Sequence, residues 1–180
     1  YLNPSYDHHL HDPFLLHDME KAVERILQAI KANETIVIYS DYDCDGIPGA
    51  VVLHDFFKAV GYQNFHNYIP HRHYDGFGLS AQAVLSIKEK YNPTLIITID
   101  CGTTDIEAVK QAREQNIEVI ITDHHEPKEE FPDALAVVNP KVGNTYPFTG
   151  LCGAGVIFKL VQALIARGGF AIPAGLEKWW

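Results

Sequence analysis

Short runs of β-branched residues alternate with helical patterns along this chain, and this alternation limits the possible folds more than any other feature of the sequence. Residues 35–39 read Thr-Ile-Val-Ile-Tyr and residues 95–99 read Leu-Ile-Ile-Thr-Ile, and a helical pattern follows each run. Strands and helices that alternate at this spacing form βαβ units, whose parallel strands lie in a sheet covered by helices on both faces. The sequence therefore predicts an α/β fold with a mostly parallel sheet.

The same patterns predict where each element lies. Strands are expected at residues 35–39, 65–69, 95–99, 117–121 and 136–138. Helices are expected at about residues 18–31, 48–60, 81–91, 105–115 and 153–167, with Asp18 and Ser80 as N-caps of the first and third. A chain of 180 residues is long enough for one compact domain with its own core. We expect this domain at residues 18–180, after an N-terminal arm at residues 1–17.

The distribution of apolar residues and cysteines bears on where such a chain works. No run of eighteen apolar residues occurs, so no membrane span is expected. Residues 1–11 lack the charged and apolar regions of a signal peptide. Cys44, Cys101 and Cys152 have no CxxC spacing, which argues against a disulfide framework and a structural zinc site. These features indicate the reducing cytoplasm.

The formal net charge of −9 at pH 7 is unusual for a protein that binds nucleic acid, because phosphate-binding surfaces are normally basic. Either the acidic residues are concentrated in a metal site, where bound cations invert the local field, or the basic surface lies on segments outside this chain. Composition alone favours an enzyme that acts on a small molecule.

Three of the expected strands run directly into acidic or histidine-containing turns, at residues 40–46, 100–102 and 122–125. In a parallel sheet, ligands bind beyond the carboxyl ends of the strands. Neighbouring strands would therefore bring these three turns to one edge of the sheet. The side chains gathered there would be those of Asp41, Asp43, Asp45, Asp100, Asp123, His124 and His125.

So many carboxylates in one small site need a cation, because like charges at short range raise one another's pKa. Carboxylates mixed with imidazole suit Mn²⁺, Mg²⁺ or Fe²⁺ better than a thiolate-type zinc site. Two such ions about 4 Å apart would share one aspartate, activate a water and stabilise the oxygens of an in-line phosphoryl displacement. A calcium-binding EF-hand is excluded, because the twelfth position counted from Asp41 is Val52 and not a glutamate.

These motifs resemble those of the DHH phosphoesterase superfamily. Asp123-His124-His125 resembles its signature triplet, and residues 41–46 and 100–102 resemble its first and second acidic motifs. Further stretches are similar to the RecJ-type single-strand DNA exonucleases within this superfamily, namely residues 13–16, 70–79, 139–140 and 151–159. The resemblance implies a Rossmann-like DHH domain with a two-metal site for Mn²⁺ or Mg²⁺.

The resemblance also implies which residues form the site. The implied metal ligands are Asp43, Asp45, Asp100 and His124, and His125 joins them as a catalytic residue that faces the scissile phosphate or supports the metals. Asp41 and Asp123 would stand behind these ligands. On the substrate side, Arg72 would contact a phosphate, Phe77 would stack on a base, and Gly76 and Gly78 would let nucleic acid come close to the backbone.

One part of the family pattern is missing. Members of the superfamily carry a fourth metal motif, an aspartate that follows a further strand, and the chain ends at Trp180, about where that strand should begin. The DHHA1 and oligonucleotide-binding domains of RecJ proteins are also absent. We therefore expect a fragment, and we expect its activity to require the missing parts.

Three functions remain open at this point. The first is a 5′–3′ exonuclease on single-stranded DNA in DNA repair and recombination, with a helicase or a single-strand-binding protein as a partner. The polarity in this hypothesis follows from the resemblance alone. The second is a phosphodiesterase for short oligonucleotides or cyclic dinucleotides, which the acidic charge favours. The third is a non-catalytic DHH-like binding module, which typically loses metal ligands, whereas this chain keeps those expected within its span.

Overall fold

A five-stranded parallel sheet forms the centre of the protein in the computed structural model, which describes residue 3 and residues 5–72 and 76–170. The strand order is β2-β1-β3-β4-β5. The strands are β1 (Ile36–Ser40), β2 (Phe65–Tyr68), β3 (Leu95–Ile99), β4 (Glu118–Thr122) and β5 (Ala136–Val138). The predicted α/β fold is confirmed, and every strand boundary lies within one residue of its predicted position.

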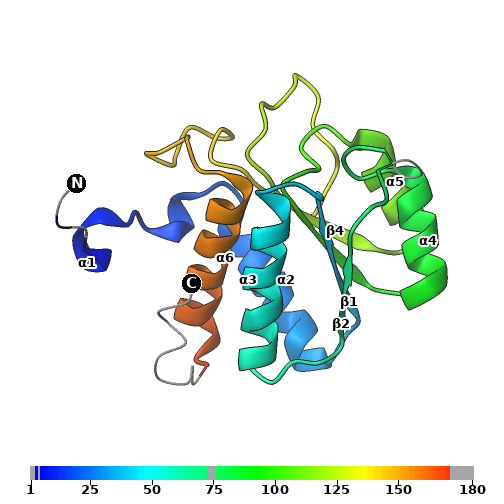
Figure 1. Cartoon of the computed structure of the whole chain (residues 1–180), viewed down its shortest axis with the longest axis horizontal. Helices are drawn as coiled ribbons and strands as arrows, with labels where there is room; N and C mark the ends of the chain where they lie inside the picture. The colour runs from blue at the N-terminus through cyan, green and yellow to red at the C-terminus, as the bar shows by residue number, and fades with distance from the viewer. Residues whose placement is uncertain (1–2, 4, 73–75, 171–180) are drawn as a thin grey trace.

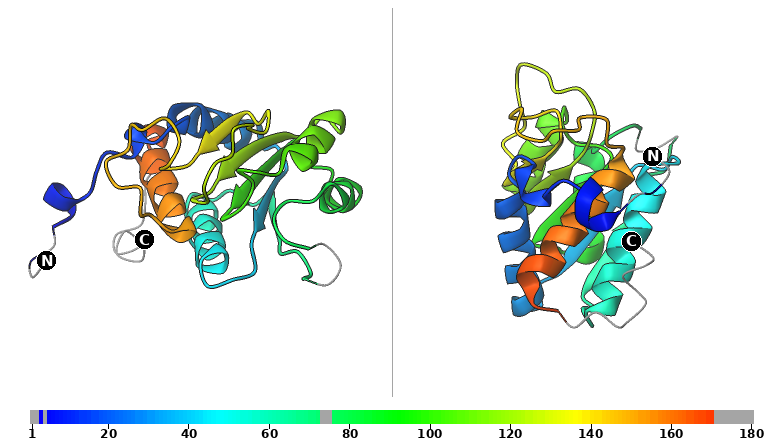
Figure 2. Two further views of the ribbon diagram at one scale, coloured as in Figure 1. Left: turned by 90° about the horizontal axis from the view of Figure 1, so that it is seen from above. Right: turned by 90° about the vertical axis from the view of Figure 1, so that its left-hand side faces the viewer.

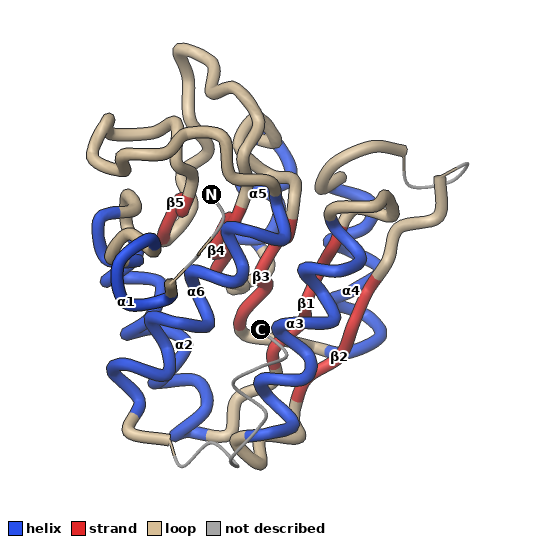
Figure 3. The backbone as a smooth tube through the Cα atoms, turned by 60° about the vertical axis from the view of Figure 1, so that its left-hand side comes forward, coloured by secondary structure: helices blue, strands red, loops and turns tan. Residues whose placement is uncertain are grey.

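Helices cover both faces of the sheet (Figures 1 and 3). One face carries α2 (Met19–Ala32), α3 (Gly46–Ala59) and α6 (Gly153–Gly168), and the other carries α4 (Ala81–Tyr91) and α5 (Ile106–Glu114). Helices α3 and α6 pack side by side. None of the helices in the described ranges is long and apolar enough to cross a membrane.

Strand β1 shows why two separate cores form on the two faces. Successive side chains of a strand point to opposite faces, so Ile36 and Ile38 pack with the helices α2, α3 and α6, while Val37 and Tyr39 pack with α4 and α5. Because both faces are covered, every residue of β1 and of β3 is buried. Burial on both faces accounts for the unbroken apolar runs by which these strands were predicted.

The starts of the helices agree with the sequence in position but differ in detail. The Ser80 hydroxyl accepts a hydrogen bond from the amide of Ala83, so Ser80 caps α4 as predicted. Asp18 occupies the N-cap position of α2, but its side chain makes no capping hydrogen bond. Helix α3 begins at Gly46, two residues before the predicted start, because Pro48 lies within its first turn, where the missing amide costs nothing.

The N-terminal arm contains two short helices that the sequence did not predict, α1 (Tyr6–His9) and η1 (Pro13–Leu15). Helix α1 lies away from the body of the domain (Figure 2). Side chains of the domain hold the arm after α1. The ammonium group of Lys159 donates to the carbonyl of His11, and the hydroxyl of Thr145 donates to the carbonyl of Leu15. The arm therefore has a defined position between α1 and α2.

Strand β5 forms one edge of the sheet. His17 and Asp18, the two residues before α2, bind Val137, the central residue of β5. The amide of Val137 donates to Oδ2 of Asp18 over 3.2 Å, and Nδ1 of His17 lies 3.2 Å from the carbonyl oxygen of Val137. Asp18 reaches this position with a left-handed backbone, at a φ of 51°. The edge-facing backbone groups of Val137 are thus bonded to side chains and not to another strand.

Candidate metal centre

The three acidic turns meet at one edge of the sheet, as predicted. Strands β1, β3 and β4 are neighbours, and the hydrogen bonding continues one residue past each of them. The amide of Asp41 donates to the carbonyl of Ile99, that of Asp100 to Thr122, and that of Asp123 to Val138. The three aspartates therefore stand in a row along the carboxyl ends of adjacent strands.

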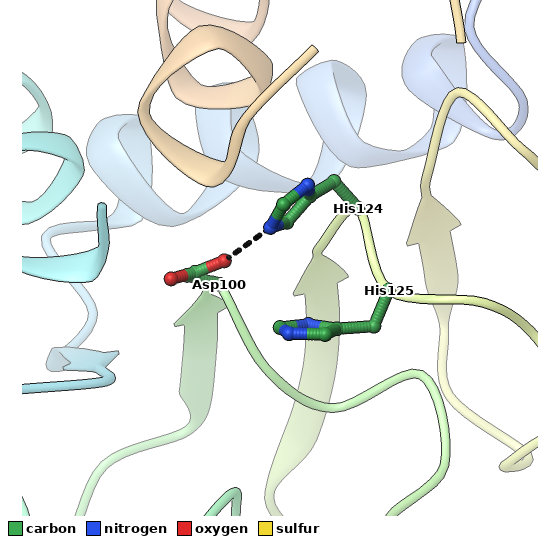
Figure 4. A group of neighbouring side chains, drawn as sticks. All are labelled: Asp100, His124 and His125. Atoms are coloured by element: carbon green, nitrogen blue, oxygen red, sulfur yellow. Dashed lines mark ion pairs between the residues drawn. The ribbon is translucent and has the colours of Figure 1, made fainter. Parts of the chain in front are cut away.

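Asp100 occupies the centre of this row. Nε2 of His124 lies 3.1 Å from Oδ1 of Asp100 and 3.4 Å from Oδ2 of Asp45. The ligand atoms of Asp100, His124 and His125 all lie within 4.8 Å of one another (Figure 4). The carboxyl groups of Asp43 and Asp100 are close enough for each to shift the pKa of the other. The structure thus brings together the side chains of the four residues that we predicted to bind metal.

The carboxyl group of Asp100 is suited to hold a cation. Its side chain is 1% exposed, and its Oδ1 has no hydrogen-bond partner among the described residues, because Nε2 of His124 approaches without hydrogen-bond geometry. Leaving such an oxygen buried and unpaired costs about 1–3 kcal/mol. Asp100 does not cap α5, whose N-cap position is Asp105. A bound cation would satisfy the unpaired oxygen.

The charges around Asp100 favour the same conclusion. Burial, followed by the nearby carboxylates of Asp45 and Asp43, raises the pKa of Asp100 to about 8. The folded protein without metal therefore holds a proton on Asp100 near neutral pH, in place of the positive charge that a cation would supply.

A pH dependence of stability follows from this shift. Without metal, the domain should lose stability as the pH rises from 3.8, the ordinary pKa of an aspartate, to about 8. Below this window Asp100 is protonated in both the folded and the unfolded chain. Within it, the unfolded chain loses the proton while the folded chain keeps it, so unfolding becomes more favourable.

Melting temperatures in the presence of a chelator, at about pH 5 and about pH 8, would measure this loss. The Asp100→Asn variant is the matched control, because it cannot ionise at this position. The wild-type protein should lose more thermal stability between the two pH values than the variant. Equal losses in both proteins would show that Asp100 does not hold a proton in the folded state.

Asp43 is held in place by the start of α3. Its Oδ1 accepts hydrogen bonds from the amides of Gly46, at 2.9 Å, and Asp45, at 2.8 Å. These two bonds are the main reason why the pKa of Asp43 lies below its ordinary value. Gly46 is needed for the tight turn, because a Cβ atom there would lie 2.5 Å from the carbonyl oxygen of Asp41.

Asp45 is held by the start of a different helix. Its carboxylate accepts hydrogen bonds from the amides of Gly153, at 2.8 Å, and Ala154, at 3.1 Å, in the first turn of α6. Burial acts to raise the pKa of Asp45, but the thiol of Cys152 and these amides hold it below the ordinary value. The positive end of the α6 dipole adds to this preference for a charged carboxylate. The sequence does not reveal these amides, since nothing in the local pattern links Asp45 to residues 153–154.

Asp123 supports the histidine turn through hydrogen bonds of its buried carboxylate. Its side chain is buried, and Oδ1 lies 2.7 Å from Nδ1 of His125, while Oδ2 accepts the amide of Thr103. Burial acts to lower the pKa of His125, but the carboxylate of Asp123 raises it above the ordinary value overall. Asp123 thus contacts His125 directly, and its predicted place behind the metal ligands stays a prediction.

Asn139 is a site residue whose contribution the sequence did not reveal. Its amide nitrogen donates to the carbonyl of His125 over 3.0 Å and to the hydroxyl of Thr103 over 3.1 Å. Asn139 follows β5, so it fastens the histidine turn after β4 to the turn after β3. Its position directly after a strand, like those of the aspartates, is the sequence signal that could have identified it.

Asp41 faces a cavity beside the cluster. The cavity has a volume of about 270 Å³ and is lined by Asp41, Asp100, Asp105, Asp123 and His125, together with Phe77, Gly78 and residues 101, 102 and 104. Asp105 is the acidic residue of this group that the sequence predicts only as the start of a helix. Because Asp100 borders both this cavity and the contact with Asp45 and His124, it can serve metal ions or substrate on both sides.

The predicted substrate residues lie at the rim of this cavity. The guanidinium carbon of Arg72 lies 5.7 Å from the ring centre of Tyr42 and 5.6 Å from that of Phe77. Phe77 is 73% exposed. Gly76, at a φ of 80°, has open space where a Cβ atom would point, whereas Gly78, at 70°, lies against the carboxylate of Asp105. Residues 73–75 of the predicted substrate segment, and the strand expected near Trp180, lie outside the described residues.

Comparisons with known proteins show the family to which this chain is similar. A family model described as "DHH family, N-terminal domain" matches residues 35–177. The single-stranded-DNA-specific exonuclease RecJ of Bacillus subtilis (strain 168) is 47% identical over 163 residues, which are 89% of this chain and 20% of that protein. The chain thus spans about a fifth of the length of this curated relative.

Solved structures of RecJ proteins are also similar to this chain. A crystal structure of exonuclease RecJ bound to manganese matches with a TM-score of 0.79 and 34% identity, over 88% of this chain and 40% of that chain. RecJ from Thermus thermophilus in complex with Mn²⁺ matches with a TM-score of 0.71 and 31% identity, over 88% of this chain and 22% of that chain. Its complex with Mg²⁺ matches with a TM-score of 0.56 and 26% identity, over 88% and 18%.

Proposed function

The chain belongs to the DHH family, and from this membership we propose that it is the catalytic domain of an exonuclease that hydrolyses single-stranded DNA with two divalent cations. The buried carboxyl group of Asp100 is the observation that carries this proposal. It lies between Asp43, Asp45 and His124, and one of its oxygens has no hydrogen-bond partner among the described residues. Together with these neighbours, such a group would hold the divalent cations.

The proposed cations are Mn²⁺ or Mg²⁺, held by Asp43, Asp45, Asp100 and His124. Oxygen ligands with one imidazole suit these hard cations. The RecJ proteins with similar folds have been crystallised with both ions. When bound, the cations would supply an activated water and stabilise charge on the phosphate oxygens.

The protein's own side chains would orient the phosphate. The Asp123 carboxylate fixes the ring of His125 through Nδ1 and favours its protonated form. The remaining ring nitrogen of His125 can then donate a hydrogen bond to an oxygen of the scissile phosphate. Asn139 would keep the turn that carries His125 in place through its bond to the His125 carbonyl.

The rim of the cavity would guide one strand of nucleic acid. Arg72 supplies a positive charge beside an otherwise acidic cavity, and the exposed ring of Phe77 offers a face on which a base can stack. A strand bound in this way would be held by its phosphates and base faces, which gives no preference for sequence.

The resemblance to RecJ supports three further parts of this proposal. The polarity would be 5′ to 3′, in DNA repair and recombination. A helicase or a single-strand-binding protein would supply or present the strand. The protein would work in the cytoplasm, in agreement with three cysteines that form no disulfide.

One observation favours a second candidate function. The net charge of −9 would weaken binding to a long polyanion more than binding to a small one. A phosphodiesterase that acts on short oligonucleotides or cyclic dinucleotides would use the same metal ligands.

Replacement of Arg72 by alanine separates these two functions. In the full-length protein, Arg72→Ala should weaken binding of single-stranded DNA several-fold and lower the slope of log K against log salt by about one unit, because one phosphate contact is lost. Metal binding should not change. Filter binding at several salt concentrations and calorimetry with Mn²⁺ would measure both.

The matched control is Arg113→Ala, which removes one positive charge from the exposed end of α5, where Arg113 pairs with Asp133. It should leave DNA binding unchanged. Hydrolysis is compared on long single-stranded DNA, a dinucleotide and a cyclic dinucleotide. If only the small substrates are cleaved and Arg72→Ala leaves DNA affinity unchanged, the exonuclease proposal is wrong and the small-substrate phosphodiesterase is the function.

A further inference from the structure

Asp105 occupies the N-cap position of α5, but its carboxylate does not cap the helix. An aspartate at this position normally accepts an amide of the first turn, a bond worth about 1 kcal/mol. Here Oδ2 of Asp105 instead accepts the amide of Leu79 over 2.7 Å, across 26 residues of sequence. The side chain therefore forgoes its local bond for a contact with the loop that precedes α4.

A second side chain holds the neighbouring peptide group of the same loop. The hydroxyl of Tyr39, at the end of β1, donates to the carbonyl of Gly78 over 2.7 Å. The side chain of Leu79 is buried in the core between the sheet, α4 and α5. The base of the loop is therefore bonded both to β1, which ends beside Asp41, and to the residue that precedes α5.

The absence of a side chain at Gly78 leaves room for the contact between Asp105 and Leu79. The backbone of Gly78 has a φ of 70°, and a Cβ atom would lie 2.7 Å from Oδ2 of Asp105. A side chain at this position would push the carboxylate away from the amide of Leu79. Gly78 thus allows the Asp105 contact, in addition to its predicted part in the approach of nucleic acid.

The loop held in this way carries the exposed ring of Phe77, and Phe77 and Arg72 lie side by side at the rim of the cavity. Phe77, Gly78, Asp105, Asp100 and His125 all line that cavity. Asp105 therefore stands between the metal cluster and the proposed substrate loop, without being among the proposed metal ligands.

We propose that Asp105 is a positioning residue for the nucleic-acid strand: through the amide of Leu79 it sets the distance of Phe77 from the metal cluster, and Arg72 lies against the ring of Phe77. This inference rests on the proposed function. It adds Asp105, which is neither a proposed metal ligand nor a proposed substrate contact. Loss of the contact would let the loop move away from the cleft, so binding of the strand would weaken while the chemical step on a bound strand would not change.

The test is the kinetics of Asp105→Ala and Asp105→Asn in the full-length protein with single-stranded DNA and Mn²⁺. Asp105→Ala should raise KM about tenfold, the usual effect of losing a charge-assisted hydrogen bond, and leave kcat within about twofold. Asp105→Asn keeps an oxygen that can accept a hydrogen bond from the Leu79 amide, so its KM should stay close to that of the wild-type protein.

Glu107→Ala is the matched control, because it removes a carboxylate from the exposed surface of the same first turn of α5. It has the same effect on the helix dipole and should leave KM unchanged. An equal rise of KM in Glu107→Ala, or a loss of kcat at unchanged KM in Asp105→Ala, would overturn the positioning role.

Hydrogen exchange at the Leu79 amide tests the contact independently of the substrate. Asp105→Ala should increase the exchange rate of this amide about tenfold or more, and Asp105→Asn should increase it less. If the protein does not hydrolyse single-stranded DNA, the proposed function fails, while this exchange still reports on the loop. If hydrolysis is normal and the Leu79 amide exchanges equally in all variants, the inference about Asp105 fails alone.

Discussion

Replacement of Asp100 by alanine is expected to lower the hydrolysis of single-stranded DNA by at least about a thousandfold. Asp100 lies within reach of Asp43, Asp45 and His124, and together these residues would hold the proposed cations. Without the Asp100 carboxylate they would hold the cations less tightly, and the several kcal/mol of charge stabilisation that the cations would supply would be lost. Single-turnover assays with the full-length protein would measure the effect.

The folded domain should survive this change. The variant loses a buried carboxyl group with an unpaired oxygen, so its free energy of unfolding without metal should rise by about 1–3 kcal/mol at pH 8. Asp100→Asn serves as the control for size, since it fills the same space but carries no charge, and it should be as inactive as Asp100→Ala. Near-normal turnover in either variant would show that Asp100 is not a metal ligand.

Replacement of Gly153 by alanine is expected to lower the metal affinity of the site, although Gly153 is not itself a proposed metal ligand. Gly153 begins α6, and a Cβ atom there would lie 2.6 Å from both Cβ and Oδ1 of Asp100. The amide of Gly153 also donates to Asp45. Relief of the clash would move Asp100 or the helix start, so we expect a loss of about 1–3 kcal/mol in stability and about 10–100-fold in metal affinity.

Gly155, two residues further along α6, offers a matched control. The nearest atom to a Cβ atom there would be the end of the Leu151 side chain, at 3.3 Å, and the Cβ atom of Leu151 and Sγ of Cys152 would lie at ordinary contact distances of 3.6 and 3.8 Å. Gly155→Ala should therefore be neutral, or stabilise the helix by about 0.5–1 kcal/mol, and leave metal affinity unchanged. Calorimetry with Mn²⁺ and thermal unfolding of both variants would decide. Equal metal affinity in the two variants would mean that α6 does not constrain Asp100.

The sequence predicts much of the fold and the position of the metal centre, for a physical reason. Strands that are buried on both faces, such as β1 and β3, have nearly continuous apolar sequences, and an aspartate follows directly after each of them. In a parallel sheet the carboxyl ends share one edge, so strand ends rich in aspartate must lie near one another when the strands are adjacent. The strand order then confirmed that Asp41, Asp100 and Asp123 are neighbours.

The supporting contacts could not be predicted in the same way. Asp45 is bonded to the amide of Gly153, 108 residues away, and Asp105 is bonded to the amide of Leu79. Backbone amides carry no sequence signal, and an aspartate before a helix looks like an ordinary cap until its partner is seen. Such contacts arise from tertiary packing, which local spacing does not encode.

The two residues before α2 also affect how copies of this domain can associate. The exposed edge of a sheet is a template on which another chain can add a strand, and this is a common route to aggregation. At β5 the amide and carbonyl of Val137 are already taken by Asp18 and His17, so an incoming strand would have to displace both side chains. β5 is also only three residues long. Fibre growth through this edge is therefore blocked by the domain's own N-terminal segment.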